Sequence, residues 1–404
     1  MLTVQTFRFL AGPQGRATLD WLATRDLSDA QTLPLLDALR RDLPPDLAAA
    51  ALTLARLRVR AAAKFIRAEV MFFTADALEQ ASGEIVSAWR ARRFAENGYA
   101  QIADLGCGIG GDALALAALP GAHVIGLDRD PLRLALARAN LAAYGRAADW
   151  VRADLTDPLP LRGVRAAFFD PARRAEGRRL FSVRDYAPPL DVIAGWRFDA
   201  LAVKLAPGVA LGELTPYTRA GAGVEFVSAG GELKEAVLWG GELGFAGRCA
   251  SRADAEETLW PLGAPPPPLS APRVYLVEPD PAIIRAGLLG ELAAHLGITL
   301  YRLDESIAYL TGDDPPPAGW VRTWRVLAWM PFQLKRLRAA LHERGIGRVT
   351  VKKRGSPLSP EETIRLLKLD GGGEEAVVVL TQVAGRHSAL ICARDETPPA
   401  GNGR

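Results

Sequence analysis

Residues 100–112, AQIADLGCGIGGD, constrain the fold of this chain more than any other segment. Ile102 and Leu105 give the apolar character of a buried strand, and Asp104 stands near its carboxyl end. The glycines that follow leave room for a ligand to lie on bare backbone: Gly106, Gly108, Gly110 and Gly111. Residues 113–119 continue as a helix. This order of strand, glycine-rich turn and helix predicts an α/β fold that binds a ligand at the carboxyl edge of its sheet.

The same glycines also fit the spacing of a dinucleotide-binding loop, but that match by itself is weak evidence. A second apolar strand, 123–127, leads to Asp128, roughly 20 residues beyond the glycines, where a carboxylate can bind both hydroxyls of an adenosine ribose. Asp128 therefore suits NAD equally well. Asp104 does not, because a carboxylate inside a phosphate-binding turn repels the pyrophosphate and attracts an ammonium or a sulfonium.

Two later strands also end in carboxylates. The strand 149–152 is followed by Asp154, which can accept a hydrogen bond from an adenine amino group, and the strand 166–169 is followed by Asp170 and Pro171. Four consecutive strands thus each deliver an acid to the carboxyl edge of the predicted sheet, where open α/β sheets bind ligands.

This arrangement resembles the class I S-adenosylmethionine-dependent methyltransferases over about residues 70–250. The resemblance implies an α/β, Rossmann-like sheet and S-adenosyl-L-methionine as the cofactor. It also implies the part of the cofactor that each residue meets: Asp104 the methionine ammonium, Asp128 the ribose, Asp154 the adenine, and Gly106, Gly108 and Gly110 the underside.

Asp170 and Pro171 occupy the position where amino-group methyltransferases of nucleobases carry an acidic or amide residue, two prolines and an aromatic residue. This chain has Ala172 and Arg173 in place of the second proline and the aromatic residue, so base stacking on an aromatic ring is lost. Arg173 can still stack on a base or pair with a phosphate. We predict that Asp170, Pro171 and Arg173 face the substrate and that Asp170 accepts a proton or orients the nucleophile. The alternative is an acid that only ends a strand and caps a turn.

Thr74 follows an apolar run and precedes a new helix, which predicts a helix N-cap. Residues 64–82 also resemble the segment before the glycine loop of several RNA cap and RNA base methyltransferases, where a threonine or its backbone covers the methionine end of the cofactor. The resemblance implies a cofactor contact for Thr74, and capping alone is the alternative.

The remaining sequence divides the chain into segments. Residues 185–196 are predicted to be helical, and so are residues 281–296. The run APPPP within 264–272 predicts a stiff, extended linker. We therefore expect these segments: a helical N-terminal extension, 1–97; a methyltransferase domain, 98–263; the linker, 264–272; a small mixed α/β domain, 273–394; and a disordered tail, 395–404.

Residues 335–354 carry eight Lys and Arg residues and one acid, Glu343. Such a helix and strand can track a phosphate backbone. We predict that these residues bind RNA: Lys335, Arg338, Lys352, Lys353 and Arg354. The layout of 273–394 resembles the bacterial methyltransferases with a THUMP-like C-terminal domain, and THUMP domains are associated with structured RNA. A basic but purely structural domain is the alternative. The arginines of the N-terminal extension, Arg90 among them, lie either on solvated helix faces or on a surface for RNA.

Composition excludes other classes. With 49% hydrophobic and 24% charged residues the chain is globular, and no apolar run is long enough to cross a membrane. The N-terminus lacks the order of a signal peptide, so we predict a cytoplasmic protein. Three widely spaced cysteines support neither a disulfide framework nor a metal site.

The predicted function is methylation of structured RNA, tRNA or rRNA. The alternatives are methylation of a protein or small molecule, and an inactive RNA-binding scaffold.

Overall fold

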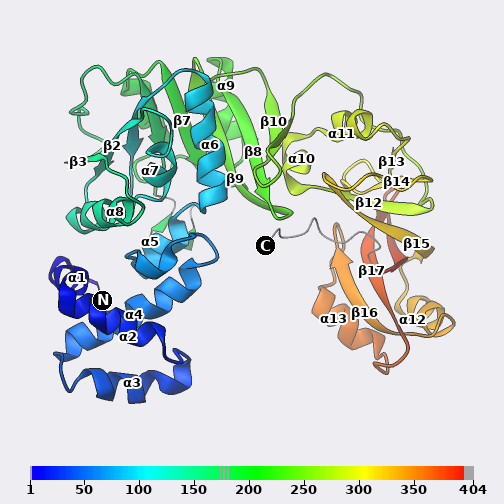
Figure 1. Cartoon of the computed structure of the whole chain (residues 1–404). Coiled ribbons are helices and arrows are strands. Elements are labelled where there is room, and N and C mark those ends of the chain that lie inside the picture. The colour runs from blue at the N-terminus through cyan, green and yellow to red at the C-terminus, as the bar shows by residue number, and fades with distance from the viewer. Residues whose placement is uncertain (1, 173, 176–177, 180–181, 395–404) are drawn as a thin grey trace. The chain divides into compact units, whose positions relative to one another are not determined.

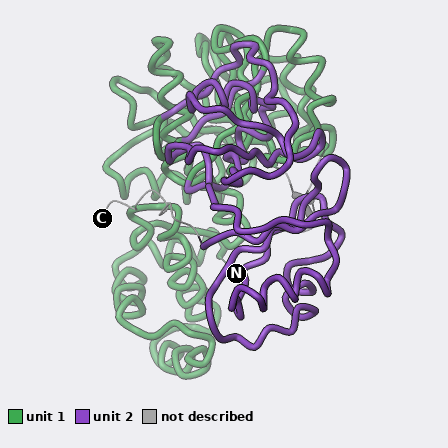
Figure 2. The backbone as a smooth tube through the Cα atoms, turned by 90° about the vertical axis from the view of Figure 1, so that its right-hand side faces the viewer, with its two compact units in different colours: residues 1–229, 234–247, 253–256 green, residues 230–233, 248–252, 257–404 purple. Residues whose placement is uncertain are grey.

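The computed structural model describes residues 2–172, 174–175, 178–179 and 182–394 of the chain. These residues fall into two compact units (Figure 2): unit 1 comprises 1–229, 234–247 and 253–256, and unit 2 comprises 230–233, 248–252 and 257–404. The domain boundaries drawn from the sequence stay a prediction. The predicted disordered tail, 395–404, lies outside the described residues.

The strands of unit 1 follow one another in the order β8-β9-β7-β4-β1-β2-β3 (Figure 1). Neighbouring strands from β7 to β3 are parallel, and β9 runs antiparallel to β7. Their bounds are β1 Gln101–Leu105, β2 His123–Asp128, β3 Asp149–Arg152, β4 Ala166–Phe169, β7 Ala200–Leu205, β8 Gly223–Ala229 and β9 Glu232–Gly241. The predicted α/β class is confirmed, and the predicted strands 149–152 and 166–169 match β3 and β4 at every residue.

Apolar side chains explain this sheet. All four residues of β4, Ala-Ala-Phe-Phe, are buried, as expected of a parallel strand covered on both faces. The crossovers include α7 Gly111–Leu116 and α8 Pro131–Ala143, and α9 Thr215–Arg219 precedes β8. A short antiparallel pair, β5 Arg174–Ala175 and β6 Arg178–Arg179, follows β4.

The predicted helix over 185–196 is wrong in its first half. Only Leu190–Gly195 are helical, as a short 3-10 helix. The two residues before it, Pro188 and Pro189, lack the N–H groups that a longer helix would need.

The N-terminal helices share the core of the sheet. Phe7 packs edge-on against Phe72 with ring centroids 5.1 Å apart, and Phe94 joins Trp239 of β9 in the same hydrophobic cluster. The helices are α1 Val4–Ala11, α2 Pro13–Ala23, α3 Thr32–Leu39, α4 Pro45–Ala61, α5 Ala75–Gln80 and α6 Glu84–Glu96. The predicted helical extension is confirmed, and it folds together with the sheet.

Glu225 of β8 ties α6 to the sheet. It is 3% exposed, and its two carboxylate oxygens accept hydrogen bonds of 2.7 Å from the indole N–H groups of Trp89 and Trp239. A buried carboxylate needs such donors, because burying it without partners is costly.

Unit 2 has a sheet of its own, in the order β13-β14-β12-β15-β18-β17-β16. Its elements are β12 Tyr275–Pro279, α10 Pro281–Ala286, α11 Leu289–Leu296, β13 Tyr301–Arg302, β14 Leu310–Gly312, β15 Val321–Pro331, α12 Leu334–His342, β16 Ile346–Lys353, α13 Pro360–Leu367, β17 Glu374–Val383 and β18 Arg386–Ala393, preceded by the hairpin of β10 Arg248–Arg252 and β11 Glu257–Leu259. The single helix predicted over 281–296 is two helices, because Gly287 adopts a left-handed conformation with φ +76°.

None of the helices within the described ranges is both long and apolar enough to cross a membrane. The longest of them, α4, has 17 residues. The predicted cytoplasmic location stays a prediction.

We expect Glu225→Gln to lower the free energy of unfolding by about 1–3 kcal/mol, because an amide NH₂ would replace one acceptor and face an indole N–H. Urea unfolding of the purified protein measures this. Glu96→Gln on α6 is the matched control, since Glu96 is solvent-exposed and forms a surface ion pair with Arg92, which is worth about 0.5 kcal/mol at most. Equal effects of the two substitutions would contradict this account.

Candidate functional site

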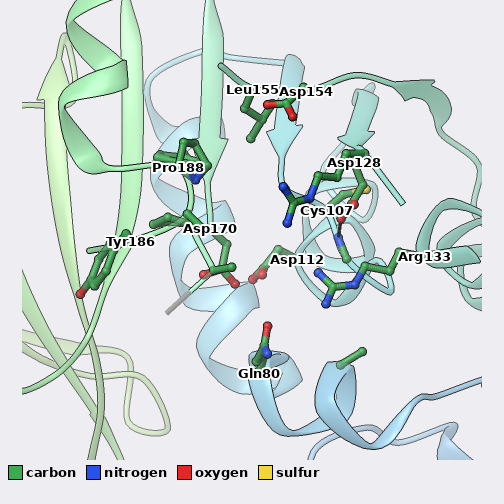
Figure 3. A pocket seen from close by; sticks show the side chains of 18 of the residues that line it. Gln80, Cys107, Asp112, Asp128, Arg133, Asp154, Leu155, Asp170, Tyr186 and Pro188 are labelled. Atoms are coloured by element: carbon green, nitrogen blue, oxygen red, sulfur yellow. Dashed lines mark hydrogen bonds between the residues drawn. The ribbon is translucent and has the colours of Figure 1, made fainter. Parts of the chain in front are cut away.

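A pocket of about 320 Å³ opens at the carboxyl edge of the parallel strands of unit 1 (Figure 3). Its walls come from the ends of β1, β2 and β4, the segment after β3, the first turns of α7 and α8, the helix α5 and residues 186–189. Of the residues predicted to bind cofactor or substrate, these line it: Gly106, Gly108, Asp128, Asp154, Asp170 and Pro171. The sheet edge that the sequence indicated is therefore the edge where the cavity lies.

The glycine loop leaves open space over its backbone. At Gly108, with φ +55°, an added Cβ would meet no atom closer than 4.0 Å, so the pocket comes directly to the main chain. At Gly106 an added Cβ would lie 2.8 Å from the carbonyl oxygen of Asp170. The loop and the end of β4 can therefore lie this close together only because Gly106 has no side chain. Gly110 does not line the pocket. Gly110 is the N-cap of α7 and has a φ of +81°. A Cβ at this position would lie 3.1 Å from the Cβ of Ala137 in α8.

Asp128, at the end of β2, is held by two backbone N–H groups. Its Oδ2 accepts from Gly108 at 3.0 Å, and its Oδ1 accepts from Asp130 at 2.9 Å. Burial raises the pKa of Asp128 above its ordinary value. The carboxylate thus links the glycine loop to the neighbouring strand end at the pocket wall.

Asp154 follows β3 and is solvent-exposed. Its Oδ1 accepts from the backbone N–H of Thr156 at 3.0 Å and from the Thr156 hydroxyl at 2.7 Å, and these bonds lower the pKa of Asp154. Within the described part of the chain, no residue donates a hydrogen bond to the other oxygen, Oδ2. That oxygen can accept from a ligand.

Asp170, directly after β4, forms an ion pair with Lys204 of β7. The Nζ of Lys204 lies 2.6 Å from Oδ2 of Asp170 and also donates to the carbonyl oxygen of Gln80 at 3.2 Å. Lys204 is almost fully buried. A buried cation therefore fixes the orientation of the Asp170 side chain. The predicted role of Asp170 toward the substrate stays a prediction. Arg173, the third residue predicted to face the substrate, lies outside the described residues.

Asp104 lies behind the glycine loop and does not line the pocket. Its side chain is 0% exposed, and neither carboxylate oxygen has a hydrogen-bond partner among the described residues. Burial, and next the negative charges of Asp112 and Asp170, raise the pKa of Asp104 well above its ordinary value. An unpartnered buried carboxylate is costly. A cationic ligand in the adjacent pocket would offset that cost.

Arg90 of α6 and Asp112 of α7 form an ion pair that the strand-end pattern of the sequence does not predict. Arg90 is 2% exposed: its Nη2 contacts Oδ1 of Asp112, its Nε lies 3.2 Å from Oε1 of Glu235, and its guanidinium lies 4.4 Å from the ring centre of Phe168. Both placements expected for Arg90, on a solvated face or a surface for RNA, are wrong. The sequence signal available was Asp112 itself, directly after the glycines.

The helix α5 is fixed at both ends. Thr74 caps it, since its Oγ1 accepts from the backbone N–H of Ala77 at 3.3 Å, and the Nζ of Lys64 donates to the carbonyl oxygens of Leu78 and Ala81 at 2.8 Å each. Thr74 does not line the pocket, whereas Ala77, Gln80 and Ala81 do. The predicted cap is confirmed, and the predicted contact of Thr74 with a cofactor stays a prediction.

The five residues predicted to bind RNA differ in their surroundings. Lys335 and Lys353 are exposed. Arg338 donates to the carbonyl oxygens of Leu366 and Leu367 at the end of α13. The remaining two are paired with one carboxylate of β12, Glu278: Lys352 at 2.6 Å and Arg354 at 3.6 Å.

We expect Asp104→Asn to make the ligand-free protein more stable at neutral pH. Because the pKa of Asp104 is raised in the folded state, the wild-type protein loses stability as the pH rises from the ordinary value of 3.8 through the raised one. Asparagine removes this loss, so the gain should grow with pH to about 1 kcal/mol or more at pH 7.5, which corresponds to about 2–4 °C in the unfolding temperature. Thermal unfolding at pH 4.5, 6.0 and 7.5 measures it.

Asp154→Asn is the matched control. Hydrogen bonds from Thr156 lower the pKa of Asp154, so this exchange at the same sheet edge should give no gain and a small loss at neutral pH. If Asp104→Asn unfolds at a lower temperature than the wild type at pH 7.5, the result would contradict the claim that the buried Asp104 carboxylate destabilises the ligand-free protein.

Comparison with known proteins identifies two parts of the chain. Residues 102–170 match the model of a methyltransferase domain, and residues 321–394 match that of a THUMP domain-like family. Residues 3–61 match a domain of unknown function. The predicted methyltransferase sheet and THUMP-like C-terminal domain are thereby confirmed.

Whole-chain relatives give the same result. Two proteins of Mycobacterium tuberculosis, from strains CDC 1551 / Oshkosh and ATCC 25618 / H37Rv, are each described as an uncharacterised S-adenosylmethionine-dependent methyltransferase. Each is 36% identical over 348 residues, which cover 83% of this chain and 94% of the relative. A crystal structure from Porphyromonas gingivalis W83, assigned as a methyltransferase, has the same fold, with a TM-score of 0.72 and 21% identity over 94% of this chain and 98% of that one. This chain therefore belongs to the class I S-adenosylmethionine-dependent methyltransferases with a THUMP-like C-terminal domain.

Proposed function

We propose that this S-adenosylmethionine-dependent methyltransferase acts on a base of structured RNA, tRNA or rRNA. The observation that carries the proposal is the THUMP-like match over residues 321–394, in a part of the chain that exposes cations at Lys335 and Lys353. THUMP domains are associated with structured RNA, and exposed cations supply the electrostatic part of RNA affinity. The enzyme class fixes the methyl donor, and the THUMP-like domain supports the substrate class.

Bound S-adenosylmethionine supplies a methyl group on a positively charged sulfur. The residues of this chain fit that molecule, because an unpartnered buried carboxylate, Asp104, stands beside a pocket whose floor at Gly108 is bare backbone. Asp128 is placed to accept from the ribose hydroxyls, and Oδ2 of Asp154 to accept from the adenine amino group. Gly106 holds the floor against β4, and Gly110 turns the chain into α7.

Asp104 adds negative charge behind the glycine loop, where it favours the ammonium and sulfonium. Thr74 acts through α5, since its cap holds the helix whose residues Ala77 and Gln80 line the pocket. In this proposal the backbone, the helix and three carboxylates bind and orient the cofactor.

The acceptor side is centred on Asp170. Lys204 binds one carboxylate oxygen, Oδ2, which leaves Oδ1 to accept a hydrogen bond from the nucleophile and to hold it in line with the methyl group. Pro171 and Arg173 complete the predicted substrate-facing set. Carbon methylation through a cysteine is disfavoured: burial raises the pKa of Cys107, the thiol lining this pocket, well above its usual range, so it stays protonated.

The substrate class is tested by transfer of labelled methyl groups to total RNA, and separately to protein, from cells lacking this gene. We expect label in the RNA fraction with the wild-type protein. With Asp170→Ala the amount of label transferred to RNA should fall by about tenfold or more, because the nucleophile loses its hydrogen-bond acceptor. Glu96→Gln on the surface of α6 should transfer as well as the wild type.

Label in the protein fraction alone would contradict the RNA substrate. Cofactor binding without any transfer would instead favour an inactive scaffold.

We expect the double variant Lys335→Ala/Lys353→Ala to bind total tRNA more weakly than the wild type. Each lost phosphate contact should also reduce the slope of log affinity against log salt by about 1, because fewer counterions are released. Titrations between about 50 and 200 mM salt measure both quantities. Arg365→Ala, an exposed cation of α13 outside the predicted set, is the control. A wild-type affinity for tRNA that does not change with salt would contradict an RNA-binding role.

A further inference from the structure

We propose that Asp112 binds the ammonium group of S-adenosylmethionine directly and that Arg90 is the residue that positions it. Neither residue follows from the strand-end pattern of the sequence. The proposal rests on the place of Asp112 in the pocket, on the hydrogen bonds of its two oxygens and on the charges around it.

Asp112 lines the cofactor pocket, whereas Asp104 lies behind the loop and does not. It is the second residue of α7, directly after the glycines. In Figure 3 its carboxylate is drawn next to that of Asp170, with Gln80 below, so it faces the part of the pocket next to the acceptor site. The methyl group is transferred to the acceptor, so the methionine end of the donor has to lie in this part of the pocket. Asp112 is the carboxylate of the first turn of α7 that can reach it.

The two oxygens of Asp112 have different partners. Oδ1 is paired with Nη2 of Arg90. Among the described residues, Oδ2 has one hydrogen-bond contact, with Oγ of Ser82 at 3.5 Å, which is too long to use its full capacity. An ammonium group offers three donors, and a charge-assisted bond to a carboxylate is among the stronger hydrogen bonds in proteins. Oδ2 can therefore accept one of them.

The surroundings of Arg90 have an excess of negative charge. Four carboxylates of the described residues act on this arginine, in the order Asp112, Glu235, Asp170 and Asp104. Burial by itself lowers the pKa of Arg90, but the carboxylates outweigh burial and raise the pKa above its ordinary value, so Arg90 stays charged. A second buried cation at this edge, Lys204, is paired with Asp170. Bound S-adenosylmethionine carries an ammonium, a sulfonium and one carboxylate, and its net positive charge offsets part of this excess.

Arg90 is suited to positioning because its guanidinium is fixed on three sides. It forms ion pairs with Asp112 and Glu235, lies over the ring of Phe168, and donates to Oγ of Ser82 at 2.9 Å. A planar guanidinium with several donors can hold a carboxylate in one orientation, which a lysine cannot reproduce. Through Arg90 the helix α6 takes part in cofactor binding.

The test is calorimetric binding of three ligands to the full-length protein: S-adenosylmethionine, S-adenosylhomocysteine and 5′-methylthioadenosine. The last of these lacks the amino-acid part. We expect Asp112→Asn to weaken the first two ligands by about tenfold or more, the usual effect of losing a charge-assisted hydrogen bond, and to leave 5′-methylthioadenosine within about twofold. Arg90→Lys should give the same selective pattern with a smaller factor.

Asp154→Asn is the matched control, because an adenine contact is common to the three ligands and its loss should weaken all of them by a similar factor. Equal losses for all three ligands with Asp112→Asn would show a merely structural role and overturn the proposal. The proposal would also be overturned if Asp112→Asn bound S-adenosylmethionine as tightly as the wild type, or if Asp104→Asn, and not Asp112→Asn, selectively lost affinity for the two amino-acid ligands.

If Asp112→Asn does not fold, Asp112→Glu decides the question, because it keeps the charge that pairs with Arg90 and moves the oxygens by one methylene. A selective loss for the two amino-acid ligands supports the proposal, and unchanged affinity for both overturns it.

Discussion

Buried carboxylates at the carboxyl edge of the parallel sheet are the constraint on which the rest of unit 1 depends. Asp104 has no hydrogen-bond partner among the described residues, and Asp112 and Asp170 each depend on a buried cation. Burying charges in this way is unfavourable unless they are paired. The two cations lie more than 100 residues apart in the sequence, Arg90 in the N-terminal helix α6 and Lys204 in β7. The packing of the N-terminal extension on the sheet therefore also supplies a cation that the carboxylates of the pocket require.

The shared core explains why the N-terminal helices belong to this arrangement. The hydrophobic cluster that contains Phe94 of α6 also contains Ile102 of β1 and Trp239 of β9. Glu225 fixes the same helix to β8 and β9 through the two tryptophans. Since α6 is held in this way, its Arg90 can serve as a fixed counter-charge to Asp112. The stability of this helix and the affinity for the cofactor should then be linked.

Much of the fold and part of the site could be predicted because their signals are local. The apolar run, the glycines and the acid at each strand end are neighbours in sequence, so the sequence alone predicts that Asp128, Asp154 and Asp170 lie at one edge of the sheet. Long-range pairs gave no such signal. Nothing in the sequence around Arg90 distinguishes it from an exposed arginine, because only the packing of α6 on the sheet buries it.

The same limit applies to the C-terminal cations. The positive charge of Arg338 predicts RNA binding, yet its guanidinium donates to carbonyl oxygens at the end of α13, a helix that starts more than twenty residues later in the chain. Pro188 and Pro189 show the opposite case, because these two prolines are a local signal against the helix predicted over 185–196.

A crystal structure of the protein with bound S-adenosylmethionine tests the central claim most directly, namely that carboxylates at this sheet edge bind a cationic cofactor. The account predicts the ammonium nitrogen about 2.7–3.0 Å from Oδ2 of Asp112, over the bare backbone of Gly108, with the adenine amino group at Asp154. An ammonium that contacts none of the carboxylates at this edge, or a cofactor bound elsewhere in the chain, would contradict it.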